Sequence, residues 1–365
     1  MTGLRRPEPC RRRRGLLRLA RWLGPGLALA IILGALSPRA APAPVFRWGF
    51  IDKSGAFVIA RQFAWAGEFG QGLAPVEDAE SGRFGFIDKS GKWVVPADFL
   101  GAKEGLREER APVETAPGKW QFVDRDGTLY GPAAGFDDAL PFQESLAAVR
   151  SGESWGYVDR AGRVVIPLGK DHVGGDFSGG LAPYRENGKM GFMDRRGRPV
   201  IPAQFDAAFG FGEGLAPVEL GGKWGYVDVN GKLVIEPRFA AARGFHDGIA
   251  RVAESATAGW GYIDKTGRMI AAARYDEAGD FRDGLAPVAQ RRDGALRWGF
   301  IDGSGAIVIP PRFGSSRAFA EGLAGVEDGF IDRTGALAIA KRFADSGDFS
   351  ENLAPVAEIL QRPSP

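Results

Sequence analysis

The chain has 365 residues, of which 44% are hydrophobic and 25% charged, a composition that excludes an intrinsically disordered protein. Its formal net charge of +2 conceals an uneven distribution, because residues 1–41 hold nine basic residues and one acidic residue. Without them, 38 of the 47 basic and 44 of the 45 acidic residues remain, a net charge of −6. A mildly acidic body without basic stripes argues against nucleic acid as a partner.

Residues 1–43 are predicted to be a signal peptide. An arginine-rich start leads into an apolar segment from Trp22 to Leu36, and small residues with prolines follow up to Ala43. The apolar segment holds about 15 residues, short of the roughly 20 that a membrane-spanning helix needs. Cleavage at residues 40–43 is therefore favoured over an uncleaved anchor, in which residues 16–36 would make the only membrane contact. We expect the mature protein in the periplasm, at the cell surface or secreted.

The single cysteine, Cys10, precedes the apolar segment. A lipoprotein anchor would need a cysteine just after that segment, so lipidation is not expected. The mature chain then has no thiols and no disulfides. Its stability must come from packing between repeats.

One motif, W-G-[FY]-[IV]-D-x-x-G, recurs nine times at intervals of about 35 residues. Residues 44–356 are therefore interpreted as nine tandem repeats, followed by a tail at residues 357–365. Each unit is too small to bury its own apolar face, so the repeats must stack. The copies begin at Trp48, Phe84, Trp120, Trp155, Met190, Trp224, Trp260, Trp298 and Asp328.

The W-G-F-I-D segment of each copy is predicted to be a strand, because aromatic and β-branched residues alternate between turn signals. Trp224 and Tyr226 would face one side of the sheet and Val227 the other. Glycine fills the second position in eight of the nine copies, Gln121 being the exception. At a repeated strand site, glycine predicts close approach of another backbone or ring. The D-x-x-G step keeps its spacing in all copies and predicts a tight turn with glycine in the left-handed conformation.

Each unit is predicted to be a three-stranded meander of G-L-A-P-V, W-G-F-I-D and x-V-I-P segments. The connection between the first two varies in length, as a solvent-exposed loop does. Proline occurs only in the first and third strands, for example at Pro75 and Pro96. Since proline cannot donate to a strand ladder, these outer strands are expected to be sheet edges. Neighbouring sheets should therefore pack face to face, as propeller blades or as steps of an open superhelical array.

The two ends of the array offer a way to close it. The array starts with a W-G strand at Trp48 that has no preceding G-L-A-P-V strand, and it ends with a G-L-A-P-V-like strand at residues 352–356 that has no following W-G strand. Pairing these two strands would close a ring. Nine blades, however, exceed the roughly four to eight that are usual in propellers. A closed ring and an open array are both compatible with the sequence.

These motifs resemble the WG-repeat (KWG-type repeat) family of bacterial proteins. Nine concordant copies carry the resemblance from Phe46 to about Val356, nearly the whole of the expected mature chain. The resemblance implies an all-β repeat array with an interaction-type role, and it brings no catalytic residues. The departures are local: Phe84, Met190 and Asp328 replace the tryptophan, and the fourth unit is irregular at residues 168–172.

Residue types for catalysis or metal binding are scarce. His172 and His246 are the only histidines, too few for a histidine-rich zinc site and unpromising for a histidine-based triad. Both histidines are interpreted as loop residues. A calcium site needs about six oxygens, which one Asp per repeat does not supply locally. Carboxylates are numerous enough for glycoside hydrolysis, but no acid outside the repeat consensus stands out. We therefore expect no enzyme activity, no metal and no cofactor.

Tryptophan provides the candidate binding residues. The six tryptophans of the motif are expected to fill the core between repeats rather than to stack on sugars, because Phe84 and Met190 replace them as core positions tolerate. Trp65 and Trp93 lie outside that register and are the candidate exposed binding residues.

The expected function is that of an exported, non-catalytic interaction scaffold that binds another protein of the bacterial envelope. Residues 77–83, 253–259 and 289–297 differ in length and charge on a constant framework, as recognition loops do. The alternative is a carbohydrate- or peptidoglycan-binding repeat protein that uses exposed aromatic residues.

Overall fold

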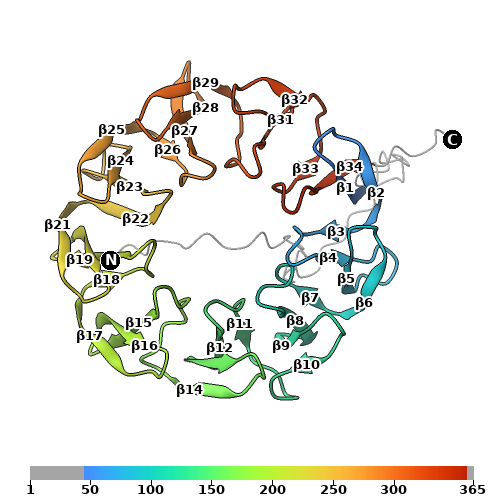
Figure 1. Cartoon of the computed structure of the whole chain (residues 1–365), viewed down its shortest axis with the longest axis horizontal. Coiled ribbons are helices and arrows are strands. Elements are labelled where there is room, and N and C mark those ends of the chain that lie inside the picture. The colour runs from blue at the N-terminus through green and yellow to red at the C-terminus, as the bar shows by residue number, and fades with distance from the viewer. Residues whose placement is uncertain (1–44, 360–365) are drawn as a thin grey trace, which may run out of the picture. The chain divides into compact units, whose positions relative to one another are not determined.

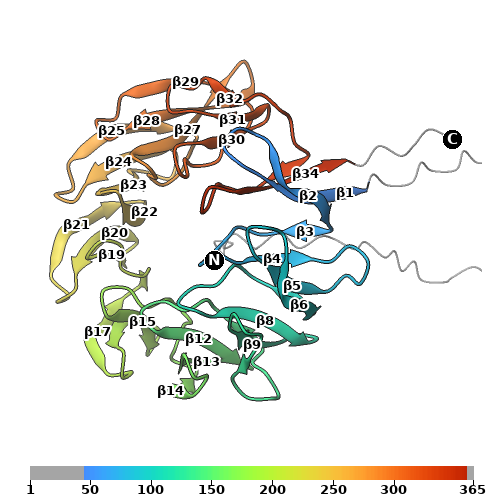
Figure 2. The ribbon, with the colours of Figure 1, turned by 45° about the vertical axis from the view of Figure 1, so that its right-hand side comes forward.

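The computed structural model describes residues 45–359, which form thirty-four strands. The predicted signal peptide and residues 360–365 lie outside the described residues. Within the described range no helix is long and apolar enough to cross a membrane. The strands form nine small antiparallel sheets that follow one another around a central bore (Figure 1). This arrangement, seen obliquely in Figure 2, is a closed nine-bladed β-propeller.

We number the blades 1 to 9 around the ring, starting with the sheet that contains both ends of the array, and give the strands from the innermost outward. Blade 1 consists of β33 (Asp345–Ser346), β34 (Ala354–Ile359), β1 (Phe46–Ile51) and β2 (Phe57–Phe63). Blade 2 consists of β3 (Trp65–Ala66), β4 (Ala74–Glu77), β5 (Phe84–Ile87) and β6 (Trp93–Phe99). Blade 3 consists of β7 (Gly101–Ala102), β8 (Ala111–Ala116), β9 (Lys119–Val123) and β10 (Leu129–Tyr130). Blade 4 consists of β11 (Asp138–Ala139), β12 (Leu146–Ser151), β13 (Ser154–Asp159) and β14 (Val164–Gly169). Blade 5 consists of β15 (Leu181–Glu186), β16 (Lys189–Asp194) and β17 (Pro199–Phe205). Blade 6 consists of β18 (Ala207–Ala208), β19 (Leu215–Leu220), β20 (Lys223–Asp228) and β21 (Leu233–Phe239). Blade 7 consists of β22 (Ala241–His246), β23 (Ile249–Ala253), β24 (Trp260–Asp264) and β25 (Met269–Tyr275). Blade 8 consists of β26 (Glu277–Ala278), β27 (Leu285–Arg292), β28 (Ala295–Asp302) and β29 (Ile307–Phe313). Blade 9 consists of β30 (Ala324–Val326), β31 (Gly329–Ile331) and β32 (Leu337–Ile339).

The predicted number of three strands per repeat is wrong for seven of the nine blades, which have four. The additional strand is the innermost one, and in six of these blades it is only two residues long. In blade 2, Trp65 and Ala66 of β3 pair with Glu77 and Val76 of β4. Two residues are too few to show the alternation by which a strand is recognised in a sequence. Blades 5 and 9 have the three strands expected.

Proline placement distinguishes true sheet edges from covered strands. Pro96 lies in β6, the outermost strand of its blade, as predicted for an edge. Pro75 lies in β4, which β3 covers on its inner side, so the prediction of an edge is wrong there. The Gly67 N–H donates to the Pro75 carbonyl at 2.9 Å. Because the amide and the carbonyl of one strand residue point to the same side, the missing proline N–H faces that inner side and leaves the ladder to β5 intact.

The hydrophobic core lies between neighbouring blades, as nine separate clusters. Alternate residues of a central strand face opposite neighbours: in β20, Tyr226 packs against blade 7 and Val227 against blade 5. The Tyr226 ring lies 5.0 Å from the ring of Phe245, the phenylalanine of the next blade's F-x-x-G turn. The same ring pair forms at eight of the nine joints, and at the ninth Phe86 packs against Leu106.

Glycine in the second position of the central strand is required by close approach of the outermost strand. A Cβ added to Gly225 would lie within 3.0 Å of backbone atoms of Glu236 and Pro237, because an irregularity in the pairing brings β21 over the central strand. Gln121 fits at this position in blade 3 because β10 ends early, and its Nε2 donates to the Pro132 carbonyl at 3.0 Å. The predicted close approach is confirmed.

Strands β1 and β34 close the ring. They pair in antiparallel fashion from Phe46 with Ile359 to Ile51 with Ala354, which is the pairing predicted from the two unpartnered ends. The closed ring is thereby confirmed and the open array is excluded. Residues 357–359, expected in the tail, belong to this closing blade.

Candidate functional site

The connections between strands lie on two opposite faces of the ring. Because neighbouring strands are antiparallel, the turns after the first and third strands of a blade share one face, and the loops after the second strand lie on the other. The first face, which we call the turn face, carries the F-x-x-G and D-x-x-G turns. The second, the loop face, carries the connections of variable length. In blade 1 the two ends of the described chain replace such a loop, since Phe46 pairs with Ile359.

Adjacent blades are joined on the turn face by a hydrogen bond that we call the clamp. The Glu351 carboxylate of blade 1 accepts the Gly72 N–H of blade 2 at 3.0 and 3.1 Å from its two oxygens. Glu351 has a φ of 54°, a left-handed conformation that few non-glycine residues adopt. Equivalent clamps of 2.6–3.0 Å form at seven further joints, with the acceptors Gln71, Glu108, Glu144, Glu213, Asp247, Asp283 and Glu321.

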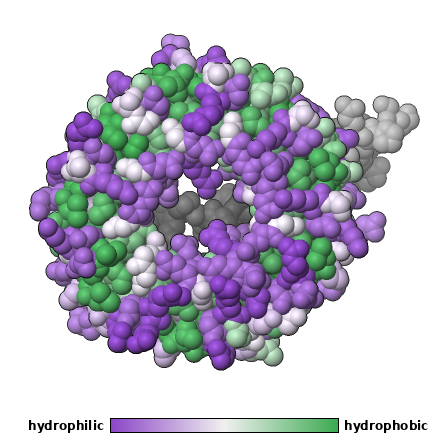
Figure 3. Space-filling model, in the orientation of Figure 1, coloured by the Kyte–Doolittle hydropathy of each residue, from purple (hydrophilic) through white to green (hydrophobic). Residues whose placement is uncertain are grey.

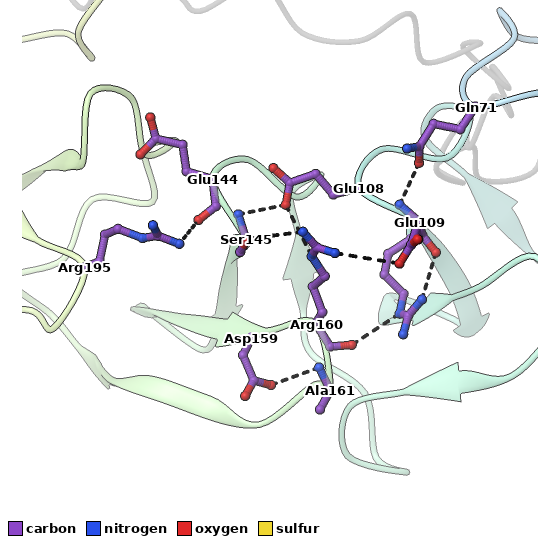
Figure 4. Close-up of polar contacts among 10 residues, drawn as sticks. Gln71, Glu108, Glu109, Glu144, Ser145, Asp159, Arg160, Ala161 and Arg195 are labelled. Atoms are coloured by element: carbon purple, nitrogen blue, oxygen red, sulfur yellow. Dashed lines mark hydrogen bonds and ion pairs between the residues drawn. The ribbon is translucent and has the colours of Figure 1, made fainter.

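A basic side chain of the next blade adds to several clamps (Figure 4). It is the residue after the Asp of D-x-x-G: Arg160 lies 3.6 Å from Glu108, and Lys89 lies 2.8 Å from Glu351. Sequence reasoning missed the clamps, although an acid in the inner turn and a base after the Asp recur along the chain. The same ion pair forms between Lys53 and Glu321 at 3.1 Å and between Lys265 and Glu213 at 3.0 Å.

The joint between blades 5 and 6 has no clamp among the described residues. Gly179 stands in place of the clamp acceptor, and Val229 stands in place of the basic residue. A Cβ added to Gly179 would meet only Val229, at 3.7 Å, so there is room for a side chain. Both clamp partners are therefore replaced together, and the apolar cluster around Phe192 and Phe211 holds this joint.

Restoring the missing clamp should stabilise the ring. The double variant Gly179→Glu with Val229→Lys is expected to raise Tm by about 2 °C, since such a contact contributes about 1 kcal/mol. The backbone permits the change, because the φ of 62° at Gly179 is close to the 53° of Glu144. Thermal melts of the double and both single variants, followed by circular dichroism, measure the coupling. Equal stability of the double variant and the wild type would contradict the role of the clamp.

Connections on the loop face differ widely between blades. Residues 221–222 join β19 to β20, whereas residues 78–83 join β4 to β5 and residues 254–259 join β23 to β24. In blade 8 the hairpin of β27 and β28 is two residue pairs longer than that of β19 and β20. Its outer part carries three arginines, Arg291, Arg292 and Arg297. The largest differences in connection length are therefore on this face.

Trp65 and Trp93, the candidate binding residues, are half-buried rather than exposed. The Trp93 ring meets the Phe63 ring edge-on at 5.9 Å and packs on the cluster between blades 1 and 2. Trp65 also packs on this cluster, and in addition it lines a cavity of about 500 Å³ at the innermost strands. Of the two, Trp65 is thus the one positioned beside space for a ligand.

The two histidines lie apart from each other in different blades. His172 is in the irregular segment that stands in place of an inner strand of blade 5, and its Nδ1 lies 3.0 Å from the Trp155 carbonyl oxygen. His246, expected in a loop, is instead the last residue of β22, where it is exposed and lies 3.8 Å from Asp280. Between residues 45 and 359, no group of three His, Cys, Asp or Glu side chains is placed to hold a metal ion.

All nine D-x-x-G segments form the predicted turn. Asp228 Oδ1 accepts the N–H groups of Asn230 and Lys232, both at 2.9 Å, and the Gly231 N–H donates to the Asp228 carbonyl at 2.9 Å. Gly231 has a φ of 81°, the left-handed conformation that favours glycine. The other eight aspartates accept the same two amide hydrogen bonds, which engages one oxygen of each carboxylate within its own turn.

These turns should make stability sensitive to acid. Hydrogen bonds from the side chains of Thr266 and Arg198 lower the pKa values of Asp264 and Asp194, respectively, to about 2 from the usual 3.8. A carboxylate whose pKa is lowered by folding stabilises the fold above about pH 4 and loses that contribution as the pH falls through 2. We expect Tm to fall between pH 4 and pH 2, and Asp264→Asn to reduce that dependence. A Tm that stays constant from pH 5 to pH 2 would rule out this linkage.

A family model of the WG containing repeat matches more than half of the chain. The chain belongs to the WG-repeat family. The resemblance expected from the motifs is thereby confirmed. The copy at Trp120 is not matched as a separate segment, in keeping with Gln121 and the short β10 of its blade. The matched segments are residues 48–78, 84–120, 155–189, 190–224, 224–254, 260–291, 298–328 and 329–358.

Solved structures similar to this WG-repeat chain are distant. AztD from Citrobacter koseri has 11% identity and a TM-score of 0.40, with 73% of this chain and 94% of AztD covered. PorZ, a surface component of the type-IX secretion system of Porphyromonas gingivalis, has 11% identity and a TM-score of 0.33, and the match covers 80% of this chain but only 46% of PorZ. Virginiamycin B lyase from Staphylococcus aureus has 10% identity and a TM-score of 0.36, with 67% and 95% covered. No curated protein matches the sequence.

The motif tryptophans of the WG repeats belong to the core, as predicted. Trp48 and Trp224 are each only 8% exposed, and Met190 is buried at the equivalent position of blade 5. The remaining four are half-buried and pack against the clusters between blades: Trp120, Trp155, Trp260 and Trp298.

Proposed function

We propose that this WG-repeat protein is an exported, non-catalytic scaffold of the bacterial envelope that binds another protein through its loop face. The observation that carries the proposal is the concentration of length variation on one face of the ring. The turn face repeats the same two turns in every blade, and clamps tie most of its joints. Loops that vary on a rigid scaffold are where proteins place recognition.

The most prominent element of the loop face is the hairpin of β27 and β28. Its ladder is the longest of the second-to-third strand hairpins, and Arg291, Arg292 and Arg297 outnumber the single acid Asp293 in its outer part. A partner surface with an acidic patch fits this hairpin, because opposite potentials steer and orient protein association.

Affinity capture with the full chain from an envelope extract tests the proposal. In one variant, residues 290–297 are replaced by Leu-Gly-Gly-Lys, the sequence at residues 220–223 of blade 6. In a matched control on the turn face, residues 302–305 are replaced by Asp-Val-Asn-Gly, the turn at residues 228–231. We expect a stoichiometric partner that the hairpin variant loses and the control retains. Capture by purified peptidoglycan alone would favour the carbohydrate-binding alternative.

Export is a separate part of the proposal and is supported by the sequence of residues 1–43. Cell fractionation combined with N-terminal sequencing of the mature protein tests it. We expect an envelope or secreted protein that begins near residues 41–44. A cytoplasmic protein that retains Met1 or Thr2 would overturn this part.

A further inference from the structure

A cavity of about 500 Å³ lies at the wall of the bore, where the ring closes. Its lining comes from β3 and the following turn of blade 2, from the inner turn of blade 3, and from β33 and its turn in blade 1. A second cavity of about 480 Å³ adjoins it, since Arg317, Asp345 and Ser346 line both. The second cavity lies beside blade 9, which lacks an inner strand. Together the two cavities form a groove at the bore. The residues around the bore are mostly hydrophilic (Figure 3).

The aromatic wall of the first cavity is not a requirement of the repeat architecture. Trp65 occupies the first position of an inner strand, opposite Glu77 of β4. In blade 2 the Trp65 ring lies 5.8 Å from the ring of Phe84, which replaces the motif tryptophan. The equivalent positions of the other inner strands hold small or acidic residues, so an inner strand can pair without an aromatic ring. These residues are Gly101, Asp138, Ala207, Ala241, Glu277 and Asp345.

Most of the charged side chains at the cavity are already paired. Glu104 lies 3.2 Å from Arg107. Lys103, which also lines the cavity, is paired with Asp138 and donates to the Ala139 carbonyl. The remaining pairs are Arg317 with Asp345 and Asp348, at 3.9 and 3.6 Å, and Arg282 with Asp348 at 3.4 Å.

Glu68 differs from these carboxylates. Its side chain lines the cavity and forms no ion pair of 4.0 Å or less with a residue of the described range. Burial raises the pKa of this carboxyl, and the charges of Arg317 and Arg282 lower it in part. Its Oε1 accepts the Asp348 N–H at 2.9 Å, which fixes the position of the carboxylate without neutralising it. A fixed carboxylate that lines the same cavity as an aromatic ring can recognise an organic cation, through a charge-assisted hydrogen bond and a cation–π contact.

We propose that this cavity binds a basic side chain, arginine or lysine, from an extended segment of the partner protein, with Trp65 and Glu68 as the recognising residues. The inference rests on the proposed scaffold function and specifies the chemistry of its partner. The adjoining second cavity favours a peptide segment over a free amine, because it extends the groove beyond the length of one side chain. Arg317 lines both cavities, and its positive charge disfavours a second basic residue next to the first.

Isothermal titration calorimetry of the full chain with the peptide acetyl-Gly-Arg-Gly-amide tests this. The peptide should bind, and its citrulline counterpart, which is isosteric and uncharged, should bind at least about tenfold more weakly. Glu68→Gln should weaken binding of the arginine peptide by a similar factor, and Trp65→Ala by about fivefold. Ala207 at the equivalent position indicates that Trp65→Ala folds, which a thermal melt verifies. Glu80→Gln, an exposed loop-face carboxylate, is the matched control and should leave binding unchanged.

Three results would overturn the inference: no binding of the arginine peptide at millimolar concentration, unchanged binding by Glu68→Gln, or Glu68-dependent binding of a glucosamine oligosaccharide without binding of the peptide. The last result would assign the cavity to an amino sugar. This test uses no partner protein, so its failure is distinct from that of the capture experiment. Loss of a partner from the hairpin variant with a silent calorimetric trace would reject only the cavity.

Discussion

Removal of the last strand should abolish cooperative folding of the ring. Truncation after Leu353 deletes β34, exposes the edge of β1 and removes Val356 and Ala357 from two interblade clusters. We expect a loss of at least about 5 kcal/mol of unfolding free energy, because several buried side chains and a full strand ladder disappear together. Urea unfolding followed by tryptophan fluorescence measures the loss.

Truncation after Ile359 is the control for this experiment, since it leaves every described strand in place and should unfold like the full chain. A synthetic peptide of residues 344–359, added to the shorter truncation, should restore part of the transition by pairing with β1. If the chain that ends at Leu353 unfolds at the same urea concentration as the full chain, ring closure does not stabilise this fold.

Gly225→Gln should destabilise the protein by about 3 kcal/mol, because the added side chain must displace the backbone of β21. The reason is local: a Cβ at this position would already contact Glu236 and Pro237 within 3.0 Å. The same repeat position holds Gln121 in blade 3, where the outermost strand is short. Chemical denaturation of both variants and of the wild type provides the comparison.

Gln121→Ala is the matched substitution in blade 3. It removes the hydrogen bond to the Pro132 carbonyl and should cost only about 1 kcal/mol. The difference between the two variants isolates the packing of the outermost strand from the general tolerance of the central strand. Equal costs at the two positions would mean that close approach of the outer strand does not explain the glycine.

The candidate site could be predicted only in part. Trp65 lies outside the tryptophan register of the motif, and it does line a cavity. Trp93 also lies outside that register, yet it packs against Phe63. Register alone cannot separate the two, since the position of a side chain relative to the next blade depends on how the blades stack. Glu68 carries no sequence signal of its own, because acids are common before the phenylalanine of the inner turn.

Local physical chemistry in the sequence determined the all-β class, the nine repeats, the central strands and the D-x-x-G turns. Alternation of apolar residues and the hydrogen bonding of an Asp-Gly turn act within a few residues, so both can be recognised in the sequence without the tertiary structure. The signal also extended to ring closure as a possibility, because the unpartnered strands at Trp48 and at residues 352–356 complete one blade between them.

Only the tertiary structure decided which contacts join one blade to the next. The two-residue inner strands form because the preceding blade positions them against a longer strand, and their own sequence has no period. Seven of the clamps connect residues 31–39 positions apart, and the clamp between Glu351 and Gly72 connects residues 279 positions apart. Whether such partners meet depends on the angle between stacked sheets. The same small rotation, repeated nine times, brings β34 beside β1 and closes the ring. No single repeat determines the total rotation around the ring, so the sequence is compatible with both a closed ring and an open array.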